Sequence, residues 1–115
     1  MTIDDNLLLL LKSSSIGDGE PDLGEKLMSS FLRVLFESGK LPGRITCMNT
    51  GIFLTTTGSA VAALLKEFED AGTEILSCGT CLEYFDRTDQ LMVGQAGNMR
   101  DTVSAMLSFK RVVSP

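Results

Sequence analysis

Hydrophobic residues in this chain follow two patterns that alternate along the sequence. The first is the continuous apolar run, and the five leucines at residues 7–11 are the clearest example. Such a run is typical of a strand that is covered on both faces of a sheet. Shorter stretches of the same character predict four further strands, at residues 44–48, 73–77, 91–93 and 111–113.

The second pattern places apolar residues three or four positions apart, which predicts helices. We expect the first helix to begin at Asp22, with Glu25 three residues on as a capping partner. It should run to about Ser38, where Gly39 would stop it. Its apolar stripe consists of Leu23, Leu27, Phe31 and Leu35.

Two further long helices follow from the same spacing. The second is expected to begin with Ser59 as its cap and to end at Gly72, and the third to begin with Asn98 as its cap. A short helix is expected to start near Gly79. The apolar stripe of the second helix is Val61, Leu64, Leu65 and Phe68, and that of the third is Met99, Val103, Met106 and Leu107.

Strands that alternate with helices predict an α/β fold with a mainly parallel sheet of five strands. Right-handed crossovers between parallel strands should place helices on both faces of that sheet. Sites in such sheets form beyond the carboxyl ends of the strands. Four loops should meet at this edge, namely residues 12–21, 49–58, 78–81 and 94–98.

Composition narrows the class of protein. The 115 residues suit a single domain that spans residues 1–115, with 43% hydrophobic residues and a formal net charge of −5. An acidic balance disfavours binding to nucleic acid or to an anionic membrane surface. The five leucines are too few for a membrane span or the core of a signal peptide, so we expect a cytoplasmic protein.

The stretch "EILSCGTCLEYF" places Cys78 and Cys81 at a predicted strand-to-helix junction. Cysteines stay reduced in the cytoplasm, so the pair points to catalysis or metal binding more than to a structural disulfide. A zinc or iron–sulfur site needs four ligands, whereas this chain has three cysteines and no histidine. One chain cannot close such a site, although a dimer could share one, and we expect no metal and no cofactor.

Redox chemistry and simple packing remain open for this pair. A Cys-x-x-Cys turn at the start of a helix is also found in thioredoxins, but there it follows an early strand and faces a cis-proline. Here the pair follows the third strand, and the only later proline is Pro115. Free cysteines often just pack, which is how we interpret Cys47 inside the second strand.

The blocks "SCGTCLEYF" and "LMVGQAGNM" resemble the DsrE-like family, and most of all the DsrE-like domain of YedF-type proteins. "LGEKLMSSFL", "MNTGIFLTTTGS" and "FEDAGTEILSCGTCL" support this resemblance, which spans about residues 7–113. It implies a three-layer α/β/α sandwich and assembly into homo-oligomers. It also implies a sulfur-relay function linked to selenium metabolism, with a TusA-like protein as sulfur donor.

In sulfur-relay members of that family, a cysteine after the third strand carries sulfur as a persulfide, and Cys78 matches this position. Cys81 would attack the persulfide and leave a Cys78–Cys81 disulfide. Backbone N–H groups near Gly79 and Thr80 would stabilise the charge on sulfur. Asn49 and Asn98 lie in loops that reach the same edge, so together with Gly79 and Thr80 they are the expected substrate-binding residues.

Two other functions remain open, and the sequence does not decide whether the protein is an enzyme. The first is a non-catalytic, oligomeric interaction module, in which residues 52–54 form an exposed apolar patch or else merely cover the edge of the sheet. The second is phosphate binding by "SSSIGDGEPDLG", whose glycines suit a phosphate loop but whose three acidic residues would repel the ligand.

Overall fold

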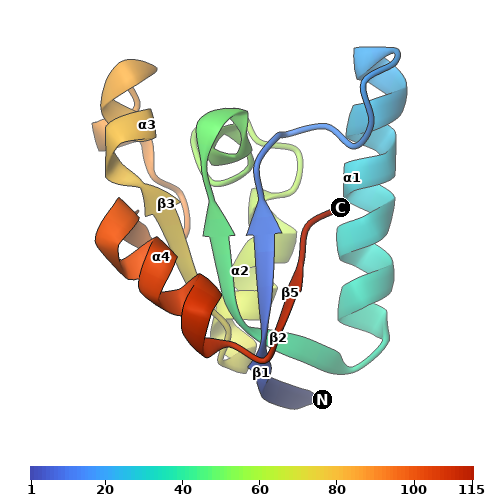
Figure 1. Cartoon of the computed structure of the whole chain (residues 1–115). Helices are drawn as coiled ribbons and strands as arrows, with labels where there is room; N and C mark the ends of the chain where they lie inside the picture. Colours follow the sequence, from blue (N-terminus) through green and yellow to red (C-terminus); the bar gives the residue numbers. More distant parts are fainter.

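Five strands form one sheet in the order β4-β3-β2-β1-β5, and every neighbouring pair is parallel (Figure 1). The computed structural model describes all residues, from Met1 to Pro115. The predicted mainly parallel five-stranded sheet is confirmed. The strands are β1 (Thr2–Leu11), β2 (Lys40–Cys47), β3 (Glu74–Cys78), β4 (Gln95–Gly97) and β5 (Arg111–Val113).

Helices cover the sheet on both faces and give three layers. The α-helices are α1 (Pro21–Glu37), α2 (Ala62–Ala71), α3 (Gly79–Tyr84) and α4 (Met99–Ser108), and the 3₁₀ helices are η1 (Asn49–Leu54) and η2 (Thr88–Gln90). Residues of α1 and α2 share one buried cluster against the sheet. The chain then crosses from β4 at one edge to β5 at the other, and a right-handed crossover in this direction puts α4 on the opposite face (Figure 1).

The unbroken leucine run lies in β1, where both faces are covered as expected. All five leucines are buried. Leu9 and Leu11 belong to the cluster under α1 and α2. Since successive side chains of a strand point to opposite faces, Leu8 and Leu10 face the α4 side. The leucine half of this strand therefore has no polar face and cannot show the alternation of a half-exposed strand.

The fourth strand is not at residues 91–93, as its apolar character suggested, but at Gln95–Gly97. Val93 is buried in the main core, and Leu91 forms only an isolated antiparallel bridge with Thr56. Gly94 then turns the chain with φ +75°, and a Cβ there would lie 2.4 Å from the Ile75 carbonyl oxygen. The apolar residues thus serve the core, while the short polar segment after them pairs with β3.

Several element ends also differ from the predictions. β1 begins at Thr2, five residues before the leucine run, and β2 begins at Lys40 and includes Pro42. The Asp22 cap is wrong, because Glu20 stands at the N-cap of α1 and Pro21 begins the helix without a side-chain cap. A proline suits the first turn, where its missing N–H needs no partner.

Of the other predicted helix ends, the two glycine stops are confirmed and the Ser59 cap is not. Ser59 accepts a hydrogen bond from the backbone N–H of Val61, but α2 begins one residue later and has no side-chain cap. Gly72 ends α2 in the left-handed conformation, as expected. Gly39 follows α1 with φ +76°, in agreement with its predicted role as a stop.

Only part of the predicted apolar stripe of α1 packs against the core, where Phe31 and Leu35 are partly buried. Leu23 and Leu27 are exposed, whereas Gly24, Met28 and Leu32 are buried. Gly24 explains the rotation, because a Cβ at this position would overlap the Ser15 side chain of the loop after β1. The loop therefore packs against the glycine and turns the Gly24 side of the helix inward.

The apolar stripe of α4 likewise points away from the sheet. All four of its predicted core residues are exposed, and the buried residues of this helix are Thr102 and Ala105. Small side chains let the helix approach the sheet closely, and the larger apolar ones remain outside. The exposed stripe consists of Met99, Val103, Met106 and Leu107.

Candidate thiol site at the carboxyl edge of the sheet

The cysteine pair lies where β3 passes directly into α3. Cys78 is the last residue of β3 and the N-cap of α3, and Cys81 follows in the first turn of that helix. Cys78 pairs with Gly97 of the neighbouring strand. A Cβ at Gly79 would lie 3.0 Å from the Gly97 carbonyl oxygen, so the glycine lets β4 approach the junction closely. Gly79 thus has a structural role at this junction.

The three cysteines differ in their access to solvent. Cys47 is fully buried in the core, as predicted, and Cys78 is only 7% exposed. Cys81 is half-buried and lines an open groove of about 470 Å³. All three are free thiols. The residues around the groove are Asn49, Thr80, Cys81, Tyr84 and Phe85.

Asn49 holds the Cys81 sulfur through its backbone rather than its side chain. Its N–H donates a hydrogen bond to Cys81 Sγ over 3.1 Å. Asn49 adopts φ +51° at the start of η1, a left-handed conformation that asparagine tolerates better than most residues. The loop after β2 and the helix after β3 therefore meet at this sulfur, so Asn49 and Thr80 lie at the groove as the sequence suggested.

Two opposing influences act on the Cys81 thiol. Burial is the largest and raises its pKa, and the neighbouring Cys78 thiol raises it further, while the Asn49 N–H lowers it. On balance the pKa of the Cys81 thiol is raised. In the core, burial alone raises the pKa of Cys47 to about 12, which keeps that thiol protonated and unreactive.

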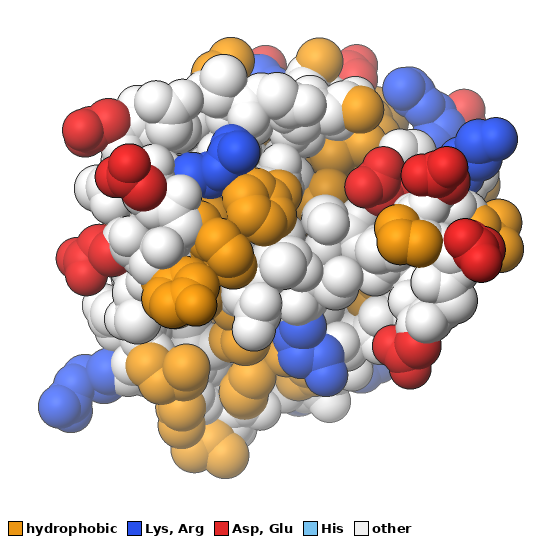
Figure 2. Space-filling view, turned by 90° about the horizontal axis from the view of Figure 1, so that it is seen from above, with side chains coloured by type: hydrophobic (Ala, Val, Ile, Leu, Met, Phe, Trp, Pro, Cys, Tyr) orange, Lys and Arg blue, Asp and Glu red, His pale blue; other side chains and the backbone are white.

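Aromatic side chains form one wall beside the groove. The Phe53 and Phe85 rings lie 4.8 Å apart, and Tyr84 packs against Phe85 edge-on at 5.1 Å. Figure 2 looks onto this edge of the molecule and shows hydrophobic side chains gathered on its α3 side, with acidic side chains around the rim. The sequence reasoning missed this wall, although "EYF" directly after the cysteine pair was a visible signal for part of it.

Arg87 is a half-buried cation that packs against this wall. Its guanidinium stacks over Phe53, with 4.6 Å from Cζ to the ring centroid. Its Nη1 donates to Thr56 Oγ1 over 3.1 Å and to the Thr57 carbonyl oxygen over 2.8 Å. The arginine thus braces the loop behind the wall, and none of the five groove residues is charged.

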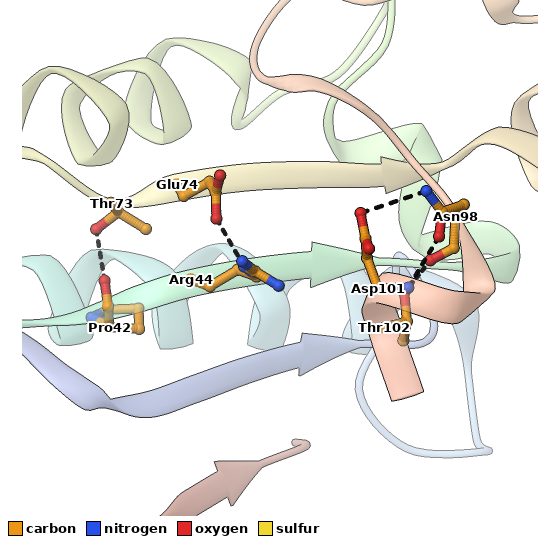
Figure 3. A network of polar contacts seen from close by, with 7 residues as sticks. All are labelled: Pro42, Arg44, Thr73, Glu74, Asn98, Asp101 and Thr102. Atoms are coloured by element: carbon orange, nitrogen blue, oxygen red, sulfur yellow. Dashed lines mark hydrogen bonds and ion pairs between the residues drawn. The ribbon is translucent and has the colours of Figure 1, made fainter. Parts of the chain in front are cut away.

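Asn98 is engaged as a helix cap and does not line the groove (Figure 3). Its Oδ1 accepts a hydrogen bond from the Asp101 N–H over 2.8 Å, and its Nδ2 donates to Asp101 Oδ2 over 3.3 Å. Thr102 Oγ1 donates to the Asn98 carbonyl oxygen over 3.0 Å. The predicted cap is therefore confirmed. Asn98 follows Gly97, the partner of Cys78, so it remains close to the pair in the fold.

Residues 52–54 do not form an exposed patch. Ile52 and Leu54 are buried in the main core, and only Phe53 is partly exposed. Of the two interpretations that the sequence left open, the one in which this segment covers the edge of the sheet is correct. No three Cys, Asp or Glu side chains converge as metal ligands would. None of the helices has the length and hydrophobicity needed to cross a membrane.

Known structures share this architecture at low sequence identity. A scan against protein-family models and a search of curated proteins both found no match. MTH1491 from Methanobacterium thermoautotrophicum, a protein of unknown function, aligns with a TM-score of 0.68 and 12% identity over 97% of this chain and 100% of its own. YchN from E. coli aligns with a TM-score of 0.66 and 16% identity over 94% of this chain and 97% of its own. These likenesses establish the α/β fold.

Proposed function

We propose that this protein is a carrier or transferase of sulfane sulfur that uses a persulfide on its Cys78–Cys81 pair. One observation carries the proposal: two free thiols, three residues apart, lie at the carboxyl edge of a parallel sheet, beside a groove that exposes one of them. Open α/β sheets bind their ligands at this edge. The resemblance to YedF-type proteins extends the proposal to selenium and names a TusA-like protein as the sulfur donor.

The chemistry requires only the two thiols and a sulfane donor. A thiolate of the pair attacks the outer sulfur of the donor persulfide, gains that sulfur, and releases the donor as a thiolate. Cys78, which matches the carrier position of the family, holds the sulfur. When Cys81 attacks the inner sulfur of this persulfide, hydrosulfide leaves and a Cys78–Cys81 disulfide forms. The Asn49 N–H stabilises negative charge on the Cys81 sulfur during these steps.

Mass spectrometry of the intact protein tests the proposal. After incubation with an organic persulfide, the wild-type protein should gain the mass of one sulfur atom, and peptide mapping should place it on Cys78 or Cys81. The double variant Cys78→Ser/Cys81→Ser should gain nothing, although it still contains the buried Cys47. An unmodified wild type, or an adduct on Cys47 alone, would contradict the proposal.

An interaction module without chemistry is the second candidate, and α4 favours it. The exposed stripe Met99, Val103, Met106 and Leu107 is a surface that another copy of the chain would cover. Sedimentation velocity should then show an oligomer that dissociates in the variant Met106→Lys/Leu107→Lys. Thiols that resist iodoacetamide in the native oligomer would favour this candidate over sulfur transfer, whereas rapid alkylation would favour the first.

A further inference from the structure

We propose that Cys81 is the entry thiol, which receives sulfur from an uncharged organic persulfide in the groove and passes it inward to Cys78. This inference rests on the proposed sulfur-transfer function and assigns the order of its steps. It separates the thiol that meets the donor from the thiol that keeps the sulfur. The resemblance by itself points to Cys78 for both roles.

Access to the two sulfur atoms gives the order. Cys81 is half-buried and lines the open groove, whereas Cys78 is 7% exposed and does not line it. A donor sulfur in the groove therefore meets Cys81 first. Thiol–disulfide and persulfide exchange needs a direct approach of one sulfur to another, so the rate depends on this access.

Burial raises the pKa of the Cys81 thiol on balance, but one neighbouring group favours negative charge on this sulfur during the exchange. The Cys81 Sγ accepts the Asn49 N–H over 3.1 Å, and this donor comes from a loop that is separate from α3. A backbone N–H directed at the sulfur favours the thiolate over the thiol. Cys78 is the N-cap of α3 and Cys81 lies three residues on in its first turn, a spacing that makes the two side chains neighbours for the second step.

Both steps balance without an added oxidant or reductant. The Cys81 thiolate bonds to the outer sulfur of the donor persulfide, the donor S–S bond breaks, and the donor leaves as a thiolate. The Cys78 thiolate then bonds to the outer sulfur now on Cys81, and Cys81 is released as a thiolate. Sulfur moves from the exposed to the buried position, where bulk solvent and foreign thiols have less access to it.

The residues that line the groove also favour a donor without charge. Asn49, Thr80, Cys81, Tyr84 and Phe85 carry no charged side chain other than a cysteine thiolate, and the chain has a net charge of −5. Arg87 stacks over Phe53 and directs its Nη1 to Thr56 and Thr57, behind the aromatic wall, and it is not one of the five lining residues. Thiosulfate meets no charged side chain among the five lining residues, while an aromatic or aliphatic persulfide can pack on the rings.

Single cysteine variants test the order of transfer with benzyl persulfide as the probe. In Cys81→Ser, loading of Cys78 should slow at least about ten-fold, because the buried thiol must meet the donor directly. In Cys78→Ser, Cys81 should load at the wild-type rate and lose its sulfur quickly to cyanide. Glu83→Gln, on an exposed position of α3, should load as the wild type does.

The outcomes separate this inference from the function it rests on. If Cys81→Ser loads as fast as the wild type, the order of transfer is wrong while sulfur transfer stands. If the wild type takes up no sulfur at all, the proposed function itself fails. Circular dichroism of each variant, together with its rate of iodoacetamide labelling, shows whether the fold and the remaining thiol are intact.

A lysine in the groove tests the choice of donor. Thr80→Lys adds a cation at an exposed position of the groove, so loading by thiosulfate should rise about ten-fold. The lysine also favours the Cys81 thiolate, which speeds loading by either donor, so the readout is the ratio of thiosulfate loading to benzyl persulfide loading, and this ratio should rise. Equal loading of the wild type by both donors would overturn the inferred preference for an uncharged donor.

Discussion

The two faces of the sheet are covered by helices that use their residues in opposite ways. Under α1 and α2 the helices bury large side chains, and Phe68 is fully buried with its ring 5.1 Å from that of Phe36. Under α4 the helix buries only Thr102 and Ala105, and Leu107 is 82% exposed. The face toward α4 also carries the Arg44–Glu74 ion pair between β2 and β3 (Figure 3).

This difference shows that similar apolar spacing can serve either a core or a free surface. On the first face, large side chains fill the space between helix and sheet. On the second face, small side chains bring the helix backbone close, and the apolar stripe of α4 is left outside. Since single exposed apolar residues are ordinary but a whole helical stripe is not, we interpret the α4 stripe as a contact surface.

The largest effect on stability should come from truncating a large buried side chain on the first face, the one under α1 and α2. Phe68→Ala should lower the free energy of unfolding by about 3–5 kcal/mol, through lost burial and the cavity that remains. Leu107→Ala on the second face should change the unfolding free energy of the monomer by less than about 0.5 kcal/mol. Urea denaturation at low protein concentration measures both. Similar losses for the two variants would mean that the faces do not differ as described.

Overpacking the second face should have the next largest effect. Ala105→Leu places a large side chain where α4 contacts the sheet, so we expect a loss of about 1–3 kcal/mol in unfolding free energy. The neighbouring exposed position offers a matched control, and Ser104→Leu should cost less than about 0.5 kcal/mol. If Ala105→Leu is tolerated equally well, α4 packs loosely and can shift outward.

The pH dependence of the unfolding free energy should show whether water reaches Cys47 in the core under α1 and α2. Burial raises the pKa of this thiol from 9.0 to about 12, so the folded state holds the proton more tightly than the unfolded chain. The contribution of the protonated Cys47 thiol to the unfolding free energy is complete below about pH 9. It is lost as the pH rises toward 12, and about 1.4 kcal/mol is lost at pH 10.

Urea denaturation of the wild type and of Cys47→Ala at about pH 8 and pH 10 separates the contribution of Cys47 from that of other titrating groups. The wild type should lose about 1.4 kcal/mol more than the variant between these two values. Cys81→Ser serves as the comparison, because its thiol is only partly buried and should give a smaller difference. An equal pH response of the wild type and Cys47→Ala would show that the core admits water.

The smallest effect should come from the start of α4. Asn98→Ala removes the cap that receives the Asp101 N–H and should cost about 1 kcal/mol in unfolding free energy. Asn98→Asp keeps an acceptor oxygen and should retain most of this stability. Because Asn98 does not line the groove, loading of the cysteine pair should stay within about two-fold of the wild type in both variants. A larger change in loading would give Asn98 the substrate-binding role expected from the sequence.

The sequence by itself determined the parallel sheet, the number of its strands, the helix stop at Gly72 and the cap at Asn98. It also placed the cysteine pair at the carboxyl edge. These features are local or periodic: a leucine run, a glycine at a helix end, a polar cap. Tertiary structure decided that α1 turns Gly24 inward, that β4 begins after Gly94, and that α4 keeps its stripe outside. It also decided that Cys81 rather than Cys78 faces the groove. Each depends on contacts between segments distant in sequence, which the spacing of residues along the chain does not encode.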